Sequence, residues 1–213
     1  MYTKEQLKRL IVPLMFEQVL TALMGSVDTI MVTNISSAAI SAVSLVDSLN
    51  ILIINIFAAM ATGGAIICAQ YLGSNQKDKA NQALKQLIFS VTLISILITI
   101  PCIVFRRPLL TLIFGSVEKS VMDNSLSYLY ITALSYPFIA LYNAAAASFR
   151  TSQNSILPMA IAFGSNILNI VGNIFFIFTL SLGVAGAAIS TLLSRIVSAL
   201  IILILLKQPK QDL

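Results

Sequence analysis

Residues 10–33 read LIVPLMFEQVLTALMGSVDTIMVT, an apolar run that contains two carboxylates, Glu17 and Asp28. A helix over this run rises about 1.5 Å per residue and is about 36 Å long, enough to cross a hydrocarbon core of about 30 Å. The run therefore predicts a membrane-spanning helix. An ionisable side chain inside such a span costs a few kcal/mol, so it normally faces protein or water and marks a functional site.

The composition of the whole chain agrees with a membrane location. Of the 213 residues, 58% are hydrophobic and 10% are charged, whereas a soluble domain carries about 25% charged residues. The sequence predicts an all-α integral membrane protein, a six-transmembrane-helix bundle in which residues 1–213 form one unit. Pro137 predicts a kink in the fourth span, because proline lacks a backbone donor. The predicted spans are residues 10–33, 45–72, 86–105, 126–147, 156–180 and 184–206.

The basic residues are distributed unevenly between the two sides of this bundle. With a cytoplasmic N-terminus, nine lysines and arginines lie on the inner side and three, Arg106, Arg107 and Lys119, lie on the outer side. Since basic residues mark cytoplasmic segments, we expect a multi-pass protein of the cell membrane with both termini in the cytoplasm. The net charge of +5 is spread between apolar runs, so we expect contact with membrane lipid and no nucleic-acid partner. The nine inner residues are Lys4, Lys8, Arg9, Lys77, Lys79, Lys85, Arg150, Lys207 and Lys210.

Polar side chains of two other spans lie at about the predicted depth of Asp28. Because chain direction alternates between spans, Asn169 and Asn173 of the fifth and Thr191 of the sixth come within about one to two turns of its level. Their oxygens suit a hard cation such as Na+, and Asp28 can instead take up a proton, so the two ions would compete. The alternative interpretation is a set of interhelical hydrogen bonds that only holds the bundle together.

The other carboxylate of the first span has a different candidate partner. Glu17 precedes Asp28 by eleven residues, which places the two about 16 Å apart on nearly the same helix face. Arg195 lies near the middle of the sixth span, at a predicted depth about 6 Å from that of Glu17. We therefore expect Glu17 and Arg195 to form a structural ion pair inside the membrane.

No catalytic set and no site for a soft metal is recognisable in the sequence. The chain has no histidine, and its two cysteines, Cys68 and Cys102, lie far apart in apolar stretches. An enzyme would need a nucleophile, a base and an orienting group, and a soft-metal site would need clustered Cys or His ligands. We expect neither an enzyme nor a metal other than Na+.

Five short stretches form a series along nearly the whole chain. They are VDTIMV (27–32), AQYLG (69–73), FRTSQNS (149–155) with Pro158 and Met159, NILN (166–169) and GVAGAA (183–188). In this order they resemble the N-terminal six-helix lobe of a MATE (multidrug and toxic compound extrusion) transporter. The resemblance implies one lobe of a two-lobed antiporter that exports small organic, often cationic, compounds in exchange for H+ or Na+. It implies no cofactor other than the coupling ion.

The resemblance also assigns roles to individual residues. MATE proteins with an ion site in this lobe use an Asp of the first span, an Asn and an Asp of the fifth span and a Thr of the sixth. Asp28, Asn169 and Thr191 match three of these positions. At the fourth, this chain has Asn173 in place of the acid. The site therefore has one carboxylate fewer, and the residues do not select between H+ and Na+.

The length of the chain leaves two further interpretations open. MATE chains contain two such lobes, so a second six-helix lobe is expected from the same longer product, from a homodimer or from a separate partner. The polar tail 207–213 lies where an interlobe linker would begin. One alternative is a lipid-linked sugar flippase of the related superfamily, whose cavity typically carries several basic residues where this chain offers Arg195. The other is a non-transporting membrane partner or a truncated half.

Overall fold

The computed structural model describes residues 4–152 and 154–207, with side chains from Ile11 onward. Gln153, in the third motif stretch, and the tail residues 208–213 lie outside the described residues. Within the described ranges all regular structure is helical. The helices are α1 (Lys4–Val32), α2 (Ser37–Gly73), α3 (Lys77–Val104), α4 (Arg106–Phe114), α5 (Lys119–Leu134), α6 (Tyr136–Thr151), α7 (Ile156–Asn173), the π-helix η1 (Ile174–Thr179) and α8 (Gly183–Leu206).

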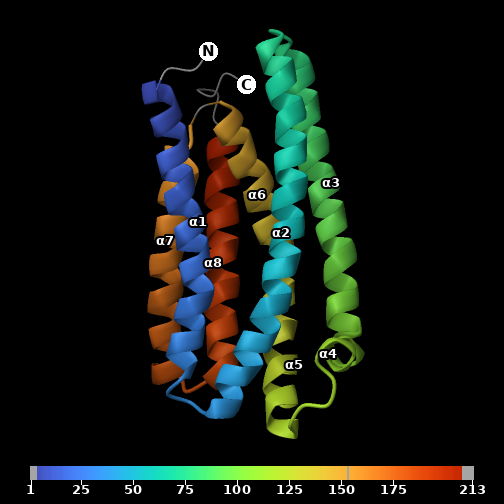
Figure 1. Ribbon diagram of the computed structural model, residues 1–213, viewed down its shortest axis with the longest axis vertical. Helices are drawn as coiled ribbons and strands as arrows, with labels where there is room; N and C mark the ends of the chain where they lie inside the picture. The colour runs from blue at the N-terminus through green and yellow to red at the C-terminus, as the bar shows by residue number, and fades with distance from the viewer. Residues whose placement is uncertain (1–3, 153, 208–213) are drawn as a thin grey trace.

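Six stretches of the described chain can cross a membrane. By length and apolar composition, α1, α2, α3, α7 with η1, and α8 each qualify, and the bent pair α5–α6 makes a sixth span. α1 begins and α8 ends at the same end of the bundle (Figure 1). Large apolar side chains such as Ile30, Phe89 and Val171 are exposed on the outside, where lipid would cover them. The predicted six-span all-α bundle is confirmed.

The helix bounds differ from the predicted spans at three places. α2 begins at Ser37 instead of residue 45, because Ser36 caps it and its Oγ accepts a hydrogen bond from the backbone N–H of Ala39 at 3.1 Å. α3 begins at Lys77 instead of residue 86, and the predicted loop 106–125 contains α4 and the first turns of α5. Polar residues are helical here because the helices extend beyond the apolar core. α2 alone has 37 residues and is about 55 Å long.

The kink that Pro137 predicts is present between α5 and α6. The two helices meet at an angle of 43° around Ser135, and Pro137 lies in the first turn of α6, where a missing N–H breaks no helical bond. The hydroxyl of Ser135 accepts a hydrogen bond from Arg195 Nη1 of α8 at 2.7 Å. The hydroxyl of the residue at the bend is thus a hydrogen-bond partner of the arginine of α8.

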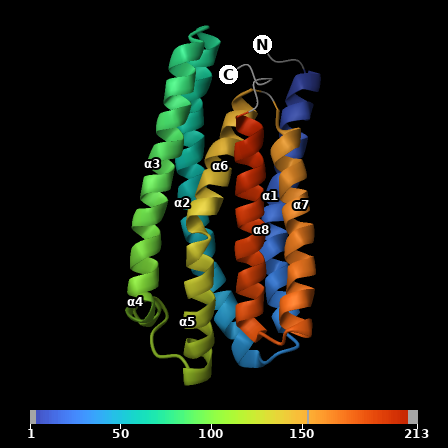
Figure 2. The same cartoon turned by 180° about the vertical axis from the view of Figure 1, so that it is seen from behind.

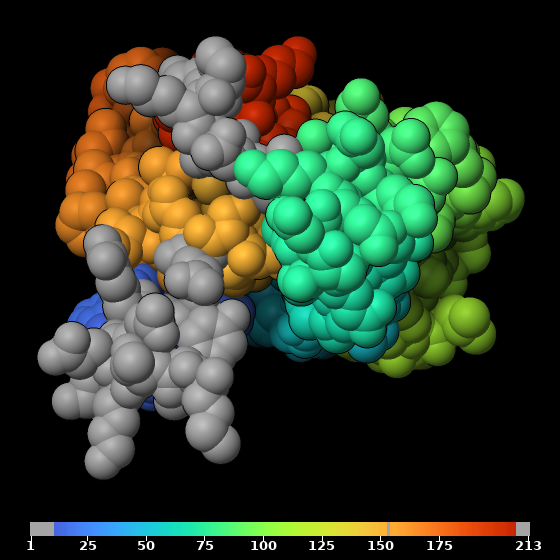
Figure 3. Space-filling view, turned by 90° about the horizontal axis from the view of Figure 1, so that it is seen from above, coloured from blue at the N-terminus to red at the C-terminus, as the bar shows by residue number. Residues whose placement is uncertain are grey.

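The helices form two groups that meet along α6 and α8. α1, α7 and α8 pack together, while α2 packs against α3, α5 and α6 (Figures 1 and 2). Seen from the end where α1 begins, the α2–α3 hairpin stands beside the rest of the bundle (Figure 3). The largest fully buried side chains include Phe57, Tyr128 and Tyr136, which fill the core between these groups.

Two glycines allow the close approach of α8 to α7 and η1. A Cβ on Gly172 would lie 2.8 Å from Ser190 Oγ, and a Cβ on Gly186 would lie 2.9 Å from the backbone C and O of Phe176. Small residues at such positions let membrane helices pack at short distance. This contact brings the polar side chains at the end of α7 within reach of α8.

Replacing Gly186 with alanine is expected to lower the free energy of unfolding by about 1–3 kcal/mol, because the new methyl group meets main chain that cannot move aside. The measurement is thermal unfolding in detergent, followed by a thiol-reactive dye, because Cys68 and Cys102 are free and buried. Gly164→Ala in α7 is the control, since no atom lies within 4 Å of its added Cβ. It should leave stability unchanged or raise it by about 0.5–1 kcal/mol. Equal destabilisation by both changes would contradict the packing described.

Candidate functional site

The structure brings the predicted polar residues Asp28, Asn169, Asn173 and Thr191 into one hydrogen-bonded network. Thr191 Oγ1 donates to Asp28 Oδ2 at 2.6 Å, and Asn173 Nδ2 donates to Asp28 Oδ1 at 2.7 Å. Asn169 Nδ2 donates to Thr191 Oγ1 at 3.1 Å. All four side chains are buried, and Asp28 is 1% exposed. The network joins α1 to both α7 and α8.

Local helix geometry positions the two asparagines of this network. Asn169 and Asn173 are four residues apart on α7 and therefore lie one turn apart on the same face. Directly after Asn173 the helix continues as the π-helix η1. π-Helical turns inside α-helices frequently occur at functional sites. Their occurrence here is consistent with a functional role for the end of α7.

The hydrogen bonds around Asp28 all run toward its carboxylate. An ionised carboxylate can only accept, so Thr191 and Asn173 fit the charged form. In the described part of the chain no basic nitrogen lies within 4 Å of the Asp28 carboxylate, and the salt bridge found there joins Glu17 to Arg150. The amide oxygen of Asn173 is buried and has no hydrogen-bond partner there. Asp28 is thus a buried carboxylate without a paired cation, beside a free oxygen ligand.

A second acid, Asp47 of α2, extends the network. The hydroxyl of Tyr128 lies 3.2 Å from Asp47 Oδ1 and 3.4 Å from Asp28 Oδ2. Asn50 Nδ2 donates to Asp47 Oδ1 at 3.1 Å, and the hydroxyl of Tyr136 donates to Asn50 Oδ1 at 2.7 Å. Neither Asp47 nor Tyr128 was predicted from the sequence as part of the site. Asp47 could have been predicted, because it is an ionisable side chain inside the predicted span 45–72. The sequence pattern gives no comparable signal for Tyr128.

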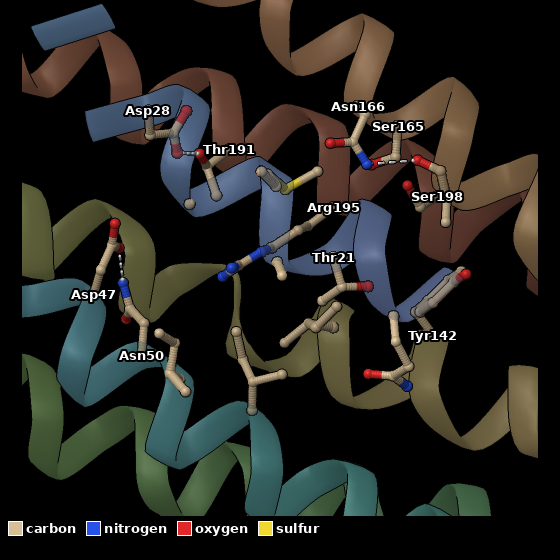
Figure 4. Close-up of a pocket in the computed structure, with 18 of the residues that line it drawn as sticks. Thr21, Asp28, Asp47, Asn50, Tyr142, Ser165, Asn166, Thr191, Arg195 and Ser198 are labelled. Atoms are coloured by element: carbon tan, nitrogen blue, oxygen red, sulfur yellow. Dashed lines mark hydrogen bonds between the residues drawn. The ribbon is translucent and has the colours of Figure 1, made fainter. Parts of the chain in front are cut away.

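The two acids face a cavity of about 300 Å³ between α1 and α2, which α5, α6, α7 and α8 also line. Figure 4 shows Asp28 and Asp47 entering it from different helices, with the side chain of Arg195 extending into the cavity to one side of them. Of the described lining residues, Arg195 is the basic one. Apolar side chains complete the wall, among them Met24, Ile51, Ile54 and Ile139. The cavity combines an apolar wall with a few charged groups, as small-molecule sites do.

The predicted ion pair between Glu17 and Arg195 is wrong. Arg150 Nη2 lies 2.7 Å from Glu17 Oε1, and the Tyr142 hydroxyl lies 3.1 Å from the same oxygen and 2.9 Å from the carbonyl oxygen of Pro158. Arg195 instead reaches Ser135 at the bend of α5–α6. Glu17 and Arg195 can lie at similar depths without meeting, because depth along a helix does not determine the direction in which a side chain points. Arg150, assigned to the cytoplasmic side, lies in the last turn of α6 and reaches Glu17 from there.

Comparisons with known proteins agree on one family. The MatE family model matches residues 13–175, which is most of the chain. The chain is 30% identical over 202 residues to the uncharacterized transporter YisQ of Bacillus subtilis, covering 92% of this chain and 44% of that protein. It is 25% identical over 203 residues to the probable multidrug resistance protein NorM of Thermotoga maritima, with coverages of 92% and 43%.

A solved structure agrees with these sequence matches. It is described as the outward-facing conformation of a multidrug resistance MATE family transporter of the MOP superfamily, and it superposes on this chain with a TM-score of 0.86 at 25% identity. The match covers 93% of this chain and 44% of that one. The chain spans about half the length of the relatives it matches. It therefore belongs to the MatE family of transporters, with the extent and fold of one six-span lobe.

Proposed function

We propose that this chain is one lobe of an antiporter in which Asp28 binds the coupling ion, H+ or Na+, while organic cations are exported. One observation carries the proposal. The carboxylate of Asp28 is buried in a membrane span and accepts hydrogen bonds from the neutral donors Thr191 and Asn173. It has no cationic salt-bridge partner among the described residues. A carboxylate in this position is stabilised by a proton or a cation. The multidrug resistance named for the Thermotoga maritima relative supports the export of drugs.

Ion binding at Asp28 would change how α1 is held. A protonated Asp28 becomes a hydrogen-bond donor, so one of the donors now facing it must move away or turn. Turning the amide of Asn173 would present its unpartnered oxygen as the acceptor. A Na+ ion would instead replace hydrogen bonds by bonds to the oxygens of Asp28, Asn173 and Thr191. Either ion exchanges bonds that join α1 to α7 and α8, and this exchange couples ion binding to the shape of the adjoining cavity.

The lobe requires a second six-span unit, from the same longer product, from a second copy or from a partner. We place both termini on the cytoplasmic face of the cell membrane. The described basic residues support this orientation, because Lys77, Lys79, Arg150 and Lys207 lie at the end where α1 begins (Figure 1). Three others, Arg106, Arg107 and Lys119, lie at the opposite end.

The test is efflux from liposomes that contain the purified protein, after a mass measurement in detergent has established how many lobes assemble. Liposomes loaded with tetraphenylphosphonium, an organic cation, are expected to lose it faster under an imposed H+ or Na+ gradient than without one. Applying the two gradients separately identifies the coupling ion. Efflux that ignores both gradients, in a preparation containing two lobes, would contradict the proposal.

A further inference from the structure

Asp47 is a carboxylate in the cavity of Asp28 that the proposed mechanism leaves unused. Its Oδ1 accepts hydrogen bonds from Asn50 and Tyr128. Its Oδ2 is buried and has no hydrogen-bond partner in the part of the chain that the structure describes. This oxygen faces Gly25 of α1, since a Cβ added there would lie 3.7 Å from it. Buried polar atoms are normally paired, so this oxygen is free to carry a proton or to bind a cation.

Tyr128 connects this acid to Asp28. Its hydroxyl lies within 3.4 Å of an oxygen of each carboxylate and is fully buried. A hydroxyl has one hydrogen and therefore donates to one carboxylate at a time. Its contact with the other carboxylate becomes favourable when that group carries a proton or when a cation lies beside it. The protonation states of Asp28 and Asp47 are thus linked through one atom.

The charges around the cavity support the same conclusion. With both acids ionised, Asp28 and Asp47 outweigh the single positive charge of Arg195, and one added monovalent cation makes the set neutral. Asn173 on α7 is fully buried, is directed at Asp28 and has an unpartnered oxygen, but it brings no charge. Among the described ionisable groups, the hydroxyl of Tyr128 of α5 contacts both acids, and Arg195 of α8 lines the same cavity. The hydroxyl of Tyr136 of α6 donates to Asn50, which in turn donates to Asp47.

Building on the proposed ion coupling, we propose that Asp47 is a second acid of the coupling site and shares one monovalent cation, H+ or Na+, with Asp28. The hydroxyl of Tyr128 links the two carboxyl groups, because it contacts an oxygen of each. A shared proton passes from one carboxyl to the hydroxyl oxygen of Tyr128 while the hydroxyl donates its own proton to the other carboxylate. The charge then moves between the acids and the tyrosine stays neutral. Asp47 supplies the second negative charge that the amide of Asn173 does not.

The experiment measures the affinity of the purified full chain for each ion separately. Binding of radioactive Na+ at fixed pH measures the affinity for sodium. The affinity for protons is measured from the difference between the acid–base titration curves of the wild-type protein and of each variant. Asp47→Asn is expected to weaken binding of the coupling ion at least about tenfold, through the loss of one charge interaction. Asp123→Asn, an exposed acid of α5, is the matched control and should keep wild-type affinity.

The outcomes separate this inference from the proposed function. Wild-type protein that binds neither ion would overturn both. Loss of binding in Asp28→Asn together with wild-type affinity in Asp47→Asn would overturn only the role of Asp47. Thermal unfolding of each variant shows whether it folds. If Asp47→Asn does not fold, Tyr128→Phe takes its place, because it keeps both carboxyls and removes their link. It is expected to weaken ion binding, and unchanged affinity would overturn the proposal.

Discussion

Replacing Asp28 with asparagine is expected to reduce gradient-driven efflux to the rate of protein-free liposomes. The new side chain has the same size and can still accept a hydrogen bond from Thr191, so the helices should remain packed. It carries no negative charge and takes up no proton, so the site can no longer bind the coupling ion. The measurement is tetraphenylphosphonium efflux under the H+ or Na+ gradient that drives the wild-type protein.

The control for this result is Asp123→Asn, which removes an exposed acid of α5 and should leave efflux unchanged. Thermal unfolding of both variants separates a lost ion site from a lost fold. Gradient-driven efflux at the wild-type rate in Asp28→Asn would remove this carboxylate from the mechanism.

Replacing Arg150 with methionine is expected to lower the free energy of unfolding by about 3 kcal/mol, the lower end for a broken buried ion pair, since the arginine side chain is 22% exposed. Glu17 is 2% exposed, and its Oε2 has no hydrogen-bond partner among the described residues. Without Arg150 its carboxylate would keep only the contact with the Tyr142 hydroxyl, whose one hydrogen can be donated instead to the carbonyl oxygen of Pro158. Thermal unfolding in detergent, followed by dye labelling of Cys68 and Cys102, measures the change.

A double variant tests the physical reason for this loss. Glu17→Gln combined with Arg150→Met removes both charges, so it should be more stable than Arg150→Met alone. Lys85→Met, which removes an exposed basic side chain of α3, should change stability by less than about 0.5 kcal/mol. If the double variant were destabilised by the sum of the two single changes, Glu17 and Arg150 would not be interacting.

Comparing depth along the spans predicted that Asn169, Asn173 and Thr191 lie near Asp28, and the structure brings these four side chains together. This succeeded because a helix rises by a fixed amount per residue and spans alternate in direction, so levels can be compared across the chain. Depth carries no information on which face a side chain occupies relative to another helix. The same reasoning therefore paired Glu17 with Arg195, whereas the structure pairs it with Arg150.

Asp47 was missed for a related reason. The predicted second span begins at residue 45, so Asp47 lies in its first turn, at the end of the predicted span. The cap at Ser36 starts α2 at Ser37, so Asp47 lies in the third turn of the helix, inside the bundle. Tyr128 could not be found from the sequence, because 100 residues separate it from Asp28 and its hydroxyl reaches both acids only after α5 packs against α2.

Equilibrium ion binding to the purified protein tests most directly whether Asp28 binds the coupling ion. Radioactive Na+ binding and proton titration of the wild-type protein and of Asp28→Asn are compared under the same conditions. We predict that the wild-type chain binds one H+ or Na+ at this site and that Asp28→Asn, while folded, loses that binding. Binding of the same ion by Asp28→Asn, with unchanged stoichiometry and affinity, would contradict the assignment of Asp28 as the ion-binding residue.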